Sequence, residues 1–227
     1  LTAQLTQGLE VYGIKADEGV IAEGEEIGEY GPYYQSARKE IYQTYAKKLV
    51  KDGLAYPCFC TAEEIDEIRA EQEHEDIKGY WGKYAKCRNL TFDEIKANIE
   101  KGMPWTLRLK SPGEIEKKCY FDDMIKGKIE MPENMIDVVL LKTDGIPTYH
   151  FAHAVDDHLM RTTHVTRGDE WIASVPLHLQ LFKVLGFKPV KYAHVAPIMK
   201  EENGGKRKLS KRKDPEAAVS YYSEVGF

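Results

Sequence analysis

The sequence has no long apolar run, few cysteines and no segment that would direct it to a membrane. Its longest uninterrupted aliphatic run is Val138–Leu141, far short of the about 18 apolar residues that span a bilayer. The opening Leu-Thr-Ala-Gln lacks an initiator Met, a basic region and an apolar region, so we expect no signal peptide. Four cysteines, two of them nearly adjacent, do not resemble a secreted disulfide framework. We therefore expect a cytoplasmic protein with no membrane partner, cut from a longer chain.

The sequence also lacks a strong excess of one charge, because its formal net charge is −5. This value argues against a general nucleic-acid coat protein. The distribution is uneven, since residues 206–213 hold six of the 32 basic residues and no acidic one. Without them the chain keeps 26 basic against 37 acidic residues, a net charge of −11. One concentrated basic stretch in an acidic chain predicts a local contact with a polyanion.

Apolar spacing and capping residues predict three helices in the first half of the chain. Residues 36–53 carry apolar side chains at helical spacing, and Gly53 suits the position after a helix end. Thr61-x-x-Glu64 and Thr91-x-x-Glu94 are capping boxes that open two short helices. Residues 71–90, which are polar and rich in tyrosine, are expected to be irregular.

The remaining elements predict an α/β fold. A helix is predicted over 171–185, closed by Gly186. Four strands are predicted, at residues 105–110, 135–141, 163–166 and 192–199. The last two strands flank the helix as in a βαβ unit, so a parallel sheet is expected, preceded by a mixed α+β segment.

The basic stretch contains Lys208-Leu-Ser-Lys-Arg212, which is suited to closing over a polyphosphate. Lysine supplies point charges, and Ser210 can donate a hydrogen bond. The alternative is a solvated basic loop. The position after a predicted strand favours the phosphate interpretation, because ligands of open α/β sheets bind beyond the carboxyl ends of strands.

A second group of chemically active residues lies between positions 145 and 171. Tyr149 and Trp171 taken singly are typical core aromatics, but together with Arg167 they can line a pocket in which the guanidinium clamps a carboxylate. The alternative use of this region is a metal site, from a set of histidines and one aspartate: His150, His153, His158 and Asp157. Structural or pocket histidines are the favoured interpretation.

Three cysteines form a third candidate site. Cys58 and Cys60 can both point at one zinc ion, with Cys87 as a third ligand. The spacing of the first two is tighter than usual for zinc, so buried free thiols are an equal alternative. Cys119 is isolated, and a structural role is expected.

Six motifs in one order resemble the bacterial glutamyl-tRNA synthetases, which are class I aminoacyl-tRNA synthetases. They are Gly31-Pro-Tyr-Tyr-Gln-Ser-x-Arg38, Pro57-Cys-Phe-Cys-Thr61, Pro147-Thr-Tyr-His-Phe-Ala152, Val155-Asp-Asp-His-Leu-Met160, Arg167-Gly-Asp-Glu-Trp171 and Lys208-Leu-Ser-Lys-Arg212. The last is similar to the mobile Lys-Met-Ser-Lys-Ser loop of class I enzymes. The matches run through almost the whole chain.

The resemblance implies a glutamate–tRNA ligase, which activates glutamate with ATP and transfers it to the 3′ end of tRNA. The implied catalytic residues are Lys208, Ser210 and Lys211, of which Lys211 stabilises the phosphates. The implied substrate-binding residues are Tyr149, His153 and Arg167. The residues implied on the side of ATP and the acceptor end are Asp169, Glu170, Trp171 and Arg212. The implied zinc ligands are Cys58, Cys60 and Cys87, with Tyr84 as the fourth.

The resemblance also implies the organisation of the chain and its partners. Residues 1–57 end the first half of a Rossmann-like nucleotide-binding fold, and residues 148–227 form its second half. Residues 58–147 form an inserted α+β subdomain that grips the acceptor stem of tRNA(Glu). The cofactors and partners implied are ATP with Mg²⁺, zinc, L-glutamate and tRNA, and a monomer is expected.

Three departures from the family pattern accompany the resemblance. His153 stands where many members carry Asn, and Asn89 occupies a usual zinc-ligand position. No His-x-Gly-His occurs, so we expect this fragment to be inactive alone. The alternatives within the class are a glutaminyl-tRNA synthetase or a paralogue that glutamylates a tRNA base. The alternative from another class is a non-catalytic tRNA- or zinc-binding module.

Overall fold

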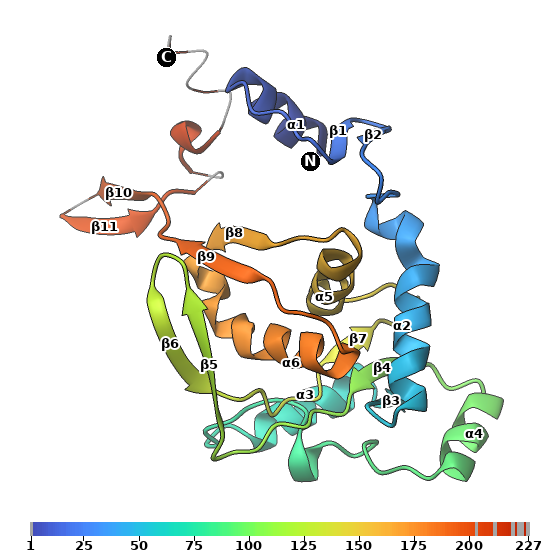
Figure 1. Ribbon diagram of the computed structural model, residues 1–227. Coiled ribbons are helices and arrows are strands. Elements are labelled where there is room, and N and C mark those ends of the chain that lie inside the picture. Colours follow the sequence, from blue (N-terminus) through green and yellow to red (C-terminus); the bar gives the residue numbers. More distant parts are fainter. Residues whose placement is uncertain (1, 203, 211–212, 219–220, 222–224, 226–227) are drawn as a thin grey trace.

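The computed structural model describes the chain apart from residues 1, 203, 211–212, 219–220, 222–224 and 226–227. Figure 1 shows a central body of sheets and helices, with the N-terminal segment and the C-terminal hairpin above it. The helices are α1 (Thr2–Val11), α2 (Lys39–Lys51), α3 (Ala62–Glu71), α4 (Phe92–Glu100), α5 (Tyr149–Leu159) and α6 (Val175–Leu185). No helix in these described ranges is long and apolar enough to cross a membrane.

The strands form two larger sheets and two separate hairpins. The four-stranded sheet has the order β6 (Gly127–Pro132), β5 (Lys118–Asp123), β9 (Lys191–Val195), β8 (His164–Gly168). The three-stranded sheet has the order β3 (Ala55–Cys58), β4 (Thr106–Leu109), β7 (Val139–Leu141). The hairpins are β1 (Gly19–Ala22) with β2 (Glu25–Ile27) and β10 (Met199–Glu202) with β11 (Gly205–Lys208).

The predicted βαβ unit is confirmed. Strands β8 and β9 are parallel, with Val165 opposite Tyr192, and α6 connects them. Helix α6 begins at Val175, four residues later than predicted, and residues 169–174 form a 3₁₀ helix. Pro176 explains this start, because proline lacks an N–H and fits only the first turn of an α-helix. Gly186 ends the helix with φ of 74°, as its sequence position predicted.

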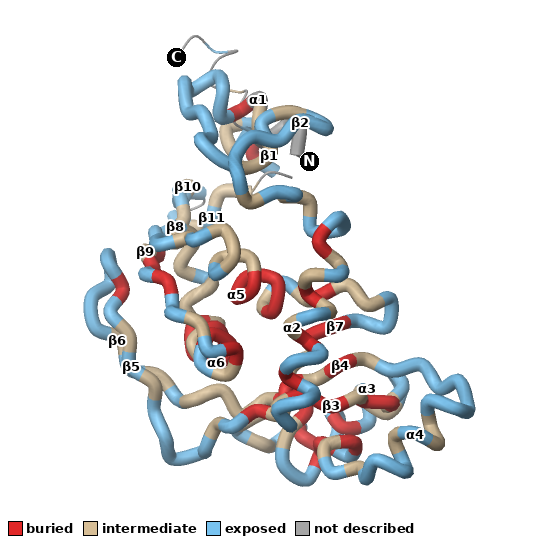
Figure 2. Tube along the Cα trace, turned by 45° about the vertical axis from the view of Figure 1, so that its right-hand side comes forward, coloured by how far each residue is buried: buried red, intermediate tan, exposed pale blue. Residues whose placement is uncertain are grey.

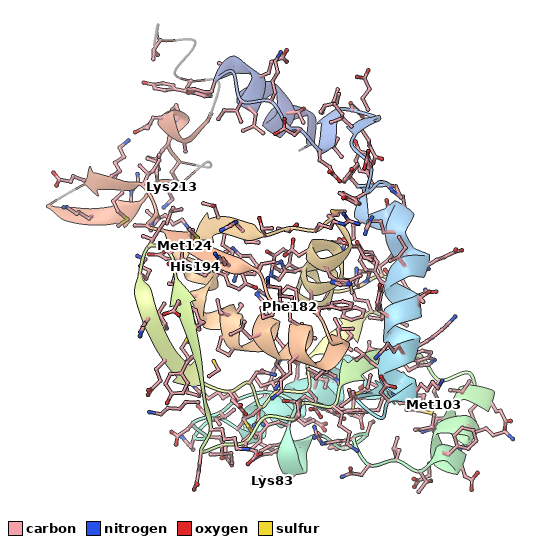
Figure 3. All side chains as sticks on the ribbon, viewed as in Figure 1. Lys83, Met103, Met124, Phe182, His194 and Lys213 are labelled. Carbon is pink, nitrogen blue, oxygen red and sulfur yellow. The ribbon has the colours of Figure 1, made fainter. Side chains whose placement is uncertain are left out.

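The hairpin β5–β6 was missed in the sequence, and it completes the four-stranded sheet. Strand β5 is parallel to β9, and Asp123 is paired with Tyr192. The Met124 N–H then donates to the Tyr192 carbonyl at 2.8 Å. Figure 3 accordingly shows Met124 beside His194, where the hairpin meets β9. The hairpin thereby reaches the carboxyl end of the βαβ unit.

Two of the predicted strands are shorter than expected. The strand predicted over 135–141 is β7, Val139–Leu141, because side-chain hydrogen bonds hold the residues before it: Asn134 donates to the Ile136 carbonyl and Asp137 receives three donors. The strand predicted over 192–199 is divided into β9 and β10 by the segment around Pro197.

The apolar core occupies the middle of the molecule, where α2, α5 and α6 meet the sheets. Phe151 and Val155 of α5 and Leu181 and Phe182 of α6 are fully buried. Figure 2 shows buried segments concentrated on these helices and on β3, β4 and β7, whereas the β5–β6 hairpin is mostly exposed. A second, separate apolar cluster surrounds Cys58 and Cys87. The polar site described next is built on the first core.

Candidate active site

The aromatic and basic residues singled out between 149 and 171 converge in the structure. Tyr149 opens helix α5, Arg167 lies near the end of β8, and Trp171 lies in the 3₁₀ helix that follows it. The ring centroids of Tyr149 and Trp171 are 4.6 Å apart, and His153 stacks on Tyr149 at 5.9 Å. Tyr149 keeps 48% of its surface exposed, so this cluster opens to solvent.

The Arg167 guanidinium is held by two histidines and has one nitrogen left over. Its Nε donates to His194 Nε2 at 3.0 Å, and its Nη2 lies 3.2 Å from His178 Nδ1. Its Nη1 is buried and has no hydrogen-bond partner among the described residues. A buried guanidinium N–H without an acceptor is costly, and a carboxylate is the kind of acceptor that fits it.

Burial favours the neutral form of two histidines near Arg167, His178 and His150. Burial lowers the pKa of His178 to about 2, with further lowering by the charges of His153 and Arg167. Burial likewise lowers the pKa of His150, whose Nδ1 lies 2.9 Å from His178 Nε2. Arg167 is the permanent positive charge at this site, and a guanidinium suits an anionic partner.

The histidine metal site considered above is not formed. His153 Nδ1 lies 2.7 Å from Asp157 Oδ2, and its Nε2 lies 2.9 Å from the Tyr192 hydroxyl. His158 stacks on Phe187 with ring centroids 3.6 Å apart. Among the residues that the structure describes, the only grouped metal-binding side chains are the three cysteines. The side chains of His153 and His158 are thus engaged in contacts within the chain.

Two residues of the Lys208–Arg212 motif, Lys208 and Leu209, line a cavity at the carboxyl ends of β8 and β9. This cavity of about 460 Å³ is lined by Gly168, Glu170, Val195, Lys208 and Leu209, among others. Lys208 Nζ lies 2.8 Å from a Glu170 carboxylate oxygen, and Asp169 pairs with Lys126 at 3.3 Å. The Ser210 N–H donates to Asp214. Lys211 and Arg212 lie outside the described residues.

The three candidate zinc ligands are brought together. The Sγ atoms of Cys58, Cys60 and Cys87 all lie within 4.8 Å of one another. A hydrogen bond from Cys87 lowers the pKa of Cys58 to about 4, and it raises the pKa of Cys87. These buried or half-buried sulfur atoms supply three of the four donors of a tetrahedral zinc site.

The tyrosine beside the thiols is Tyr80, not the predicted Tyr84. The Tyr80 hydroxyl lies 3.2 Å from Cys60 Sγ and accepts the Cys87 N–H at 3.0 Å. The Tyr84 hydroxyl instead donates to Glu75 at 2.9 Å. The reason is geometric, since a short 3₁₀ helix at Gly82–Tyr84 turns Tyr84 toward Glu75.

Comparisons with known proteins decide the family. A family profile described as the catalytic domain of class I tRNA synthetases (E and Q) matches residues 1–227. The chain belongs to this family. The glutamate–tRNA ligase of Clostridium beijerinckii is 58% identical over 95% of this chain and 39% of its own length. That of Acetivibrio thermocellus is 52% identical over 98% of this chain and 41% of its own length.

Solved structures of the same kind agree with the fold. A glutamate tRNA ligase from Elizabethkingia meningosepticum, crystallised in complex with its amino acid, is 37% identical, with a TM-score of 0.79 over 98% of this chain and 42% of that chain. The mixed α/β architecture expected from the sequence is thus confirmed. The resemblance to the E and Q class I synthetases is confirmed as well. The chain spans about 40% of the length of the curated relatives it matches.

Several residues of this synthetase catalytic domain were missed in the sequence. His178 and His194 contact the Arg167 guanidinium, Asp123 contacts His194, and each of the three is almost fully buried. They come from α6, β9 and β5, so no local spacing links them. The one available signal was the placement of His194 in a strand predicted to run parallel beside the strand of Arg167.

A larger cavity of this E/Q synthetase domain lies away from these residues. It has a volume of about 700 Å³ and lies between α2, β4 and the turn after β7, where Val50, Met103 and Trp105 line it. None of the predicted site residues lines it. The candidate active site is therefore identified by its chemistry and not by cavity volume.

Proposed function

We propose that the full-length protein is a glutamate–tRNA ligase. The observation that carries this proposal is the buried Nη1 of Arg167, a positive group with an unsatisfied N–H beside a solvent-open aromatic cluster. Glutamate is an amino acid with a second carboxylate, and a guanidinium fork suits it better than it suits a neutral side chain. The identity of 52–58% to glutamate–tRNA ligases supports the same substrate.

The reaction proceeds in two displacements. An oxygen of the glutamate α-carboxylate attacks the α-phosphorus of ATP, and pyrophosphate leaves. A ribose hydroxyl of the terminal adenosine of tRNA(Glu) then attacks the activated carbonyl, loses its proton and displaces AMP. Both steps depend on positioning and on neutralising phosphate charge more than on covalent help from the protein.

The residues divide these tasks between the two sides of the site. Arg167 anchors a carboxylate of glutamate, while Tyr149 and His153 line the amino-acid pocket. ATP occupies the cavity at the ends of β8 and β9, where Glu170 forms part of the wall. Asp169 and Trp171 flank Glu170 in the same 3₁₀ helix. Lys208, Ser210, Lys211 and Arg212 supply donors and positive charge to the phosphates. Mg²⁺ bound with ATP neutralises phosphate charge.

Entry of ATP requires a change of ion pairs. In the structure Lys208 is paired with Glu170 at 2.8 Å, both at the rim of this cavity. A triphosphate offers Lys208 a stronger anionic partner than one exposed carboxylate. Lys208 therefore leaves Glu170 when the nucleotide binds, and its release accompanies closure of the basic loop.

The domain division that we propose follows the synthetase family. Residues 1–57 and 148–227 belong to the two halves of a Rossmann-like fold, and residues 58–147 form the inserted subdomain that contacts the acceptor stem of tRNA. The βαβ unit of β8, α6 and β9 supports the assignment of the second half. Zinc held by Cys58, Cys60 and Cys87 would fix the fold of the inserted subdomain.

Glutamate-dependent exchange of ATP with pyrophosphate, measured in the presence of tRNA with the full-length protein, tests the proposal. Arg167→Lys keeps the charge but loses the planar fork, so KM for glutamate should rise by about tenfold or more. Arg108→Lys is the matched control. Arg108 is a half-buried arginine whose guanidinium lies 4.1 Å over the Tyr80 ring, away from the site. The Arg108→Lys substitution should leave KM for glutamate unchanged.

The outcome also separates the related functions. Exchange with glutamine in place of glutamate would make the protein a glutaminyl-tRNA synthetase. Activation of glutamate with transfer to an internal tRNA base would make it the tRNA-modifying paralogue. Binding of tRNA without any exchange of ATP with pyrophosphate would favour a non-catalytic tRNA-binding module.

A further inference from the structure

A buried aspartate and a buried histidine connect the β5–β6 hairpin to Arg167. Asp123 Oδ2 lies 2.6 Å from His194 Nδ1, and neither side chain has any exposed surface. The other carboxylate oxygen, Oδ1, accepts the N–H groups of Ile125 and Lys126 at 3.0 and 2.9 Å. Oδ1 therefore shapes the turn of the hairpin, and Oδ2 is committed to the histidine.

The geometry fixes the tautomer of His194. Arg167 is always protonated, and its Nε carries a hydrogen, so the His194 nitrogen 3.0 Å away must accept. His194 is therefore neutral, with a bare Nε2 and its hydrogen on Nδ1, where the ring donates to Asp123. Burial alone would raise the pKa of Asp123. Hydrogen bonds from the Lys126 and Ile125 N–H groups and from the His194 ring outweigh this effect and lower the pKa to about 2. An ionised carboxylate only accepts hydrogen bonds, so Asp123 selects this tautomer.

The same logic applies on the other side of the guanidinium. His178 Nδ1 accepts from Arg167 Nη2 at 3.2 Å, and the Trp171 carbonyl lies 3.4 Å from the same nitrogen. The Tyr192 ring lies under the guanidinium, 4.7 Å from its centre. With Nε and Nη2 held in this way, the direction of Nη1 is determined.

We propose that Asp123 and His194 are positioning residues that orient the Arg167 guanidinium toward the substrate carboxylate. The inference rests on the proposed function, in which that carboxylate belongs to glutamate. It assigns a task to a strand of the predicted inserted subdomain: β5 fixes, through one histidine of β9, the binding group carried by β8. Neither residue touches the ligand.

Asp123→Asn is the sharpest test, because it keeps the shape and the Oδ1 acceptor but replaces Oδ2 with an N–H donor. His194 then accepts at Nδ1 and carries its hydrogen on Nε2, so two donors face each other at Arg167. In the full-length protein, KM for glutamate in pyrophosphate exchange should rise by about tenfold or more, with KM for ATP within about twofold of wild type.

Two substitutions of His194 distinguish a positioning role from a packing role. His194→Gln retains an acceptor for Arg167 and a donor for Asp123, and it should keep KM for glutamate within about threefold of wild type. His194→Leu removes both and should behave like Asp123→Asn. Equal KM values for the Gln and Leu variants would overturn the inference.

Asp137→Asn is the matched control. Asp137 is also fully buried and accepts hydrogen bonds from Tyr56 at 2.6 Å and the Ser111 N–H at 2.8 Å, but it lies in the other sheet region. Its replacement should lower thermal stability without changing KM for glutamate. A rise in KM equal to that of Asp123→Asn would mean that any buried charge has this effect, and would reject the positioning role.

A measurement that needs no activity distinguishes the two proposals. In ¹⁵N-histidine-labelled wild-type protein, the ¹⁵N shifts of His194 should report a neutral ring protonated at Nδ1. A ring protonated at Nε2, or at both nitrogens, overturns the inference even if the enzyme activates glutamate. If the wild type shows this tautomer but activates no glutamate, the proposed function fails while the Asp123–His194–Arg167 arrangement stands.

Discussion

Among single residues, His178 carries a consequence for stability. Its imidazole is fully buried, and its Nδ1 lies 3.2 Å from Arg167 Nη2, so a proton added to Nδ1 would face another donor. Burial is the largest cause of its lowered pKa, followed by the charges of His153 and Arg167. Because the unfolded chain takes up a proton near pH 6.5 and the folded chain does not, acid favours unfolding.

We expect the free energy of unfolding to fall by about 2 kcal/mol through His178 between pH 7 and pH 5. The sign follows from the lowered folded-state pKa, since the stability is present above the unfolded pKa and is lost as the pH falls below it. Urea titrations at the two pH values should reveal this loss in wild type, and a loss smaller by about this amount in His178→Asn. Parallel pH dependence in the two proteins would contradict the assignment.

Some residues of the site could be predicted from the sequence, and others could not. Arg167 and Tyr149 were predicted because motifs surround them. His178 and His194 follow Arg167 by 11 and 27 positions, and only the packing of α6 and β9 onto β8 brings them to the guanidinium. The resemblance implied Tyr84 beside the thiols, but in the structure the hydroxyl of Tyr80 lies there, and that of Tyr84 donates to Glu75.

At the scale of elements, two identical caps serve helices of unequal importance. Thr61 opens α3 and Thr91 opens α4, each with a complete capping box. Helix α3 buries Ile68 in the cluster around the cysteines, whereas α4 buries no residue among those described. Loss of the first cap should therefore reach the core, and loss of the second should remain local.

We expect Thr61→Ala to lower the free energy of unfolding by about 1 kcal/mol. Thr91→Ala removes the same hydrogen bonds, but α4 can fray without unfolding the rest of the chain. Urea unfolding should therefore register the first change and scarcely the second, and hydrogen exchange should detect fraying of α4. Equal global losses for both variants would show that α4 contributes to the core.

The elements that the sequence predicted are those with local signals. Caps at Thr61 and Thr91, the glycine at 186 and helical spacing over 36–53 all correspond to helices in the structure. The β5–β6 hairpin was missed because its strands carry few apolar residues, and its partner β9 lies far along the chain. Helix α5 was missed because its apolar and polar side chains were interpreted as a pocket lining.

At the scale of the whole molecule, the two apolar clusters differ in how much apolar packing stabilises them. The larger cluster joins α2, α5, α6 and the strands, and it contains many large apolar side chains. The smaller one surrounds the three thiols and holds few large aliphatic side chains. A metal ion would therefore contribute more to the smaller cluster.

We expect the protein to bind one zinc ion per chain through Cys58, Cys60 and Cys87. Cys60→Ser should reduce the zinc content measured by elemental analysis, and a chelator should destabilise the smaller cluster first. Cys119→Ser is the control, because Cys119 lies in β5 outside the group. Zinc content near zero, with freely titratable thiols at 58, 60 and 87, would falsify the site.

The join between β5 and β9 has a consequence for biosynthesis. Asp123 and His194 are 71 positions apart, so at about 5–20 residues per second β5 leaves the ribosome about 4–14 s before its partner. During that interval the edge of β5 that later pairs with β9 has unpaired backbone N–H and C=O groups. Such an unpaired edge is prone to aggregation. The site around Arg167 is thus completed only after β9 emerges, and translation speed sets how long the nascent chain waits.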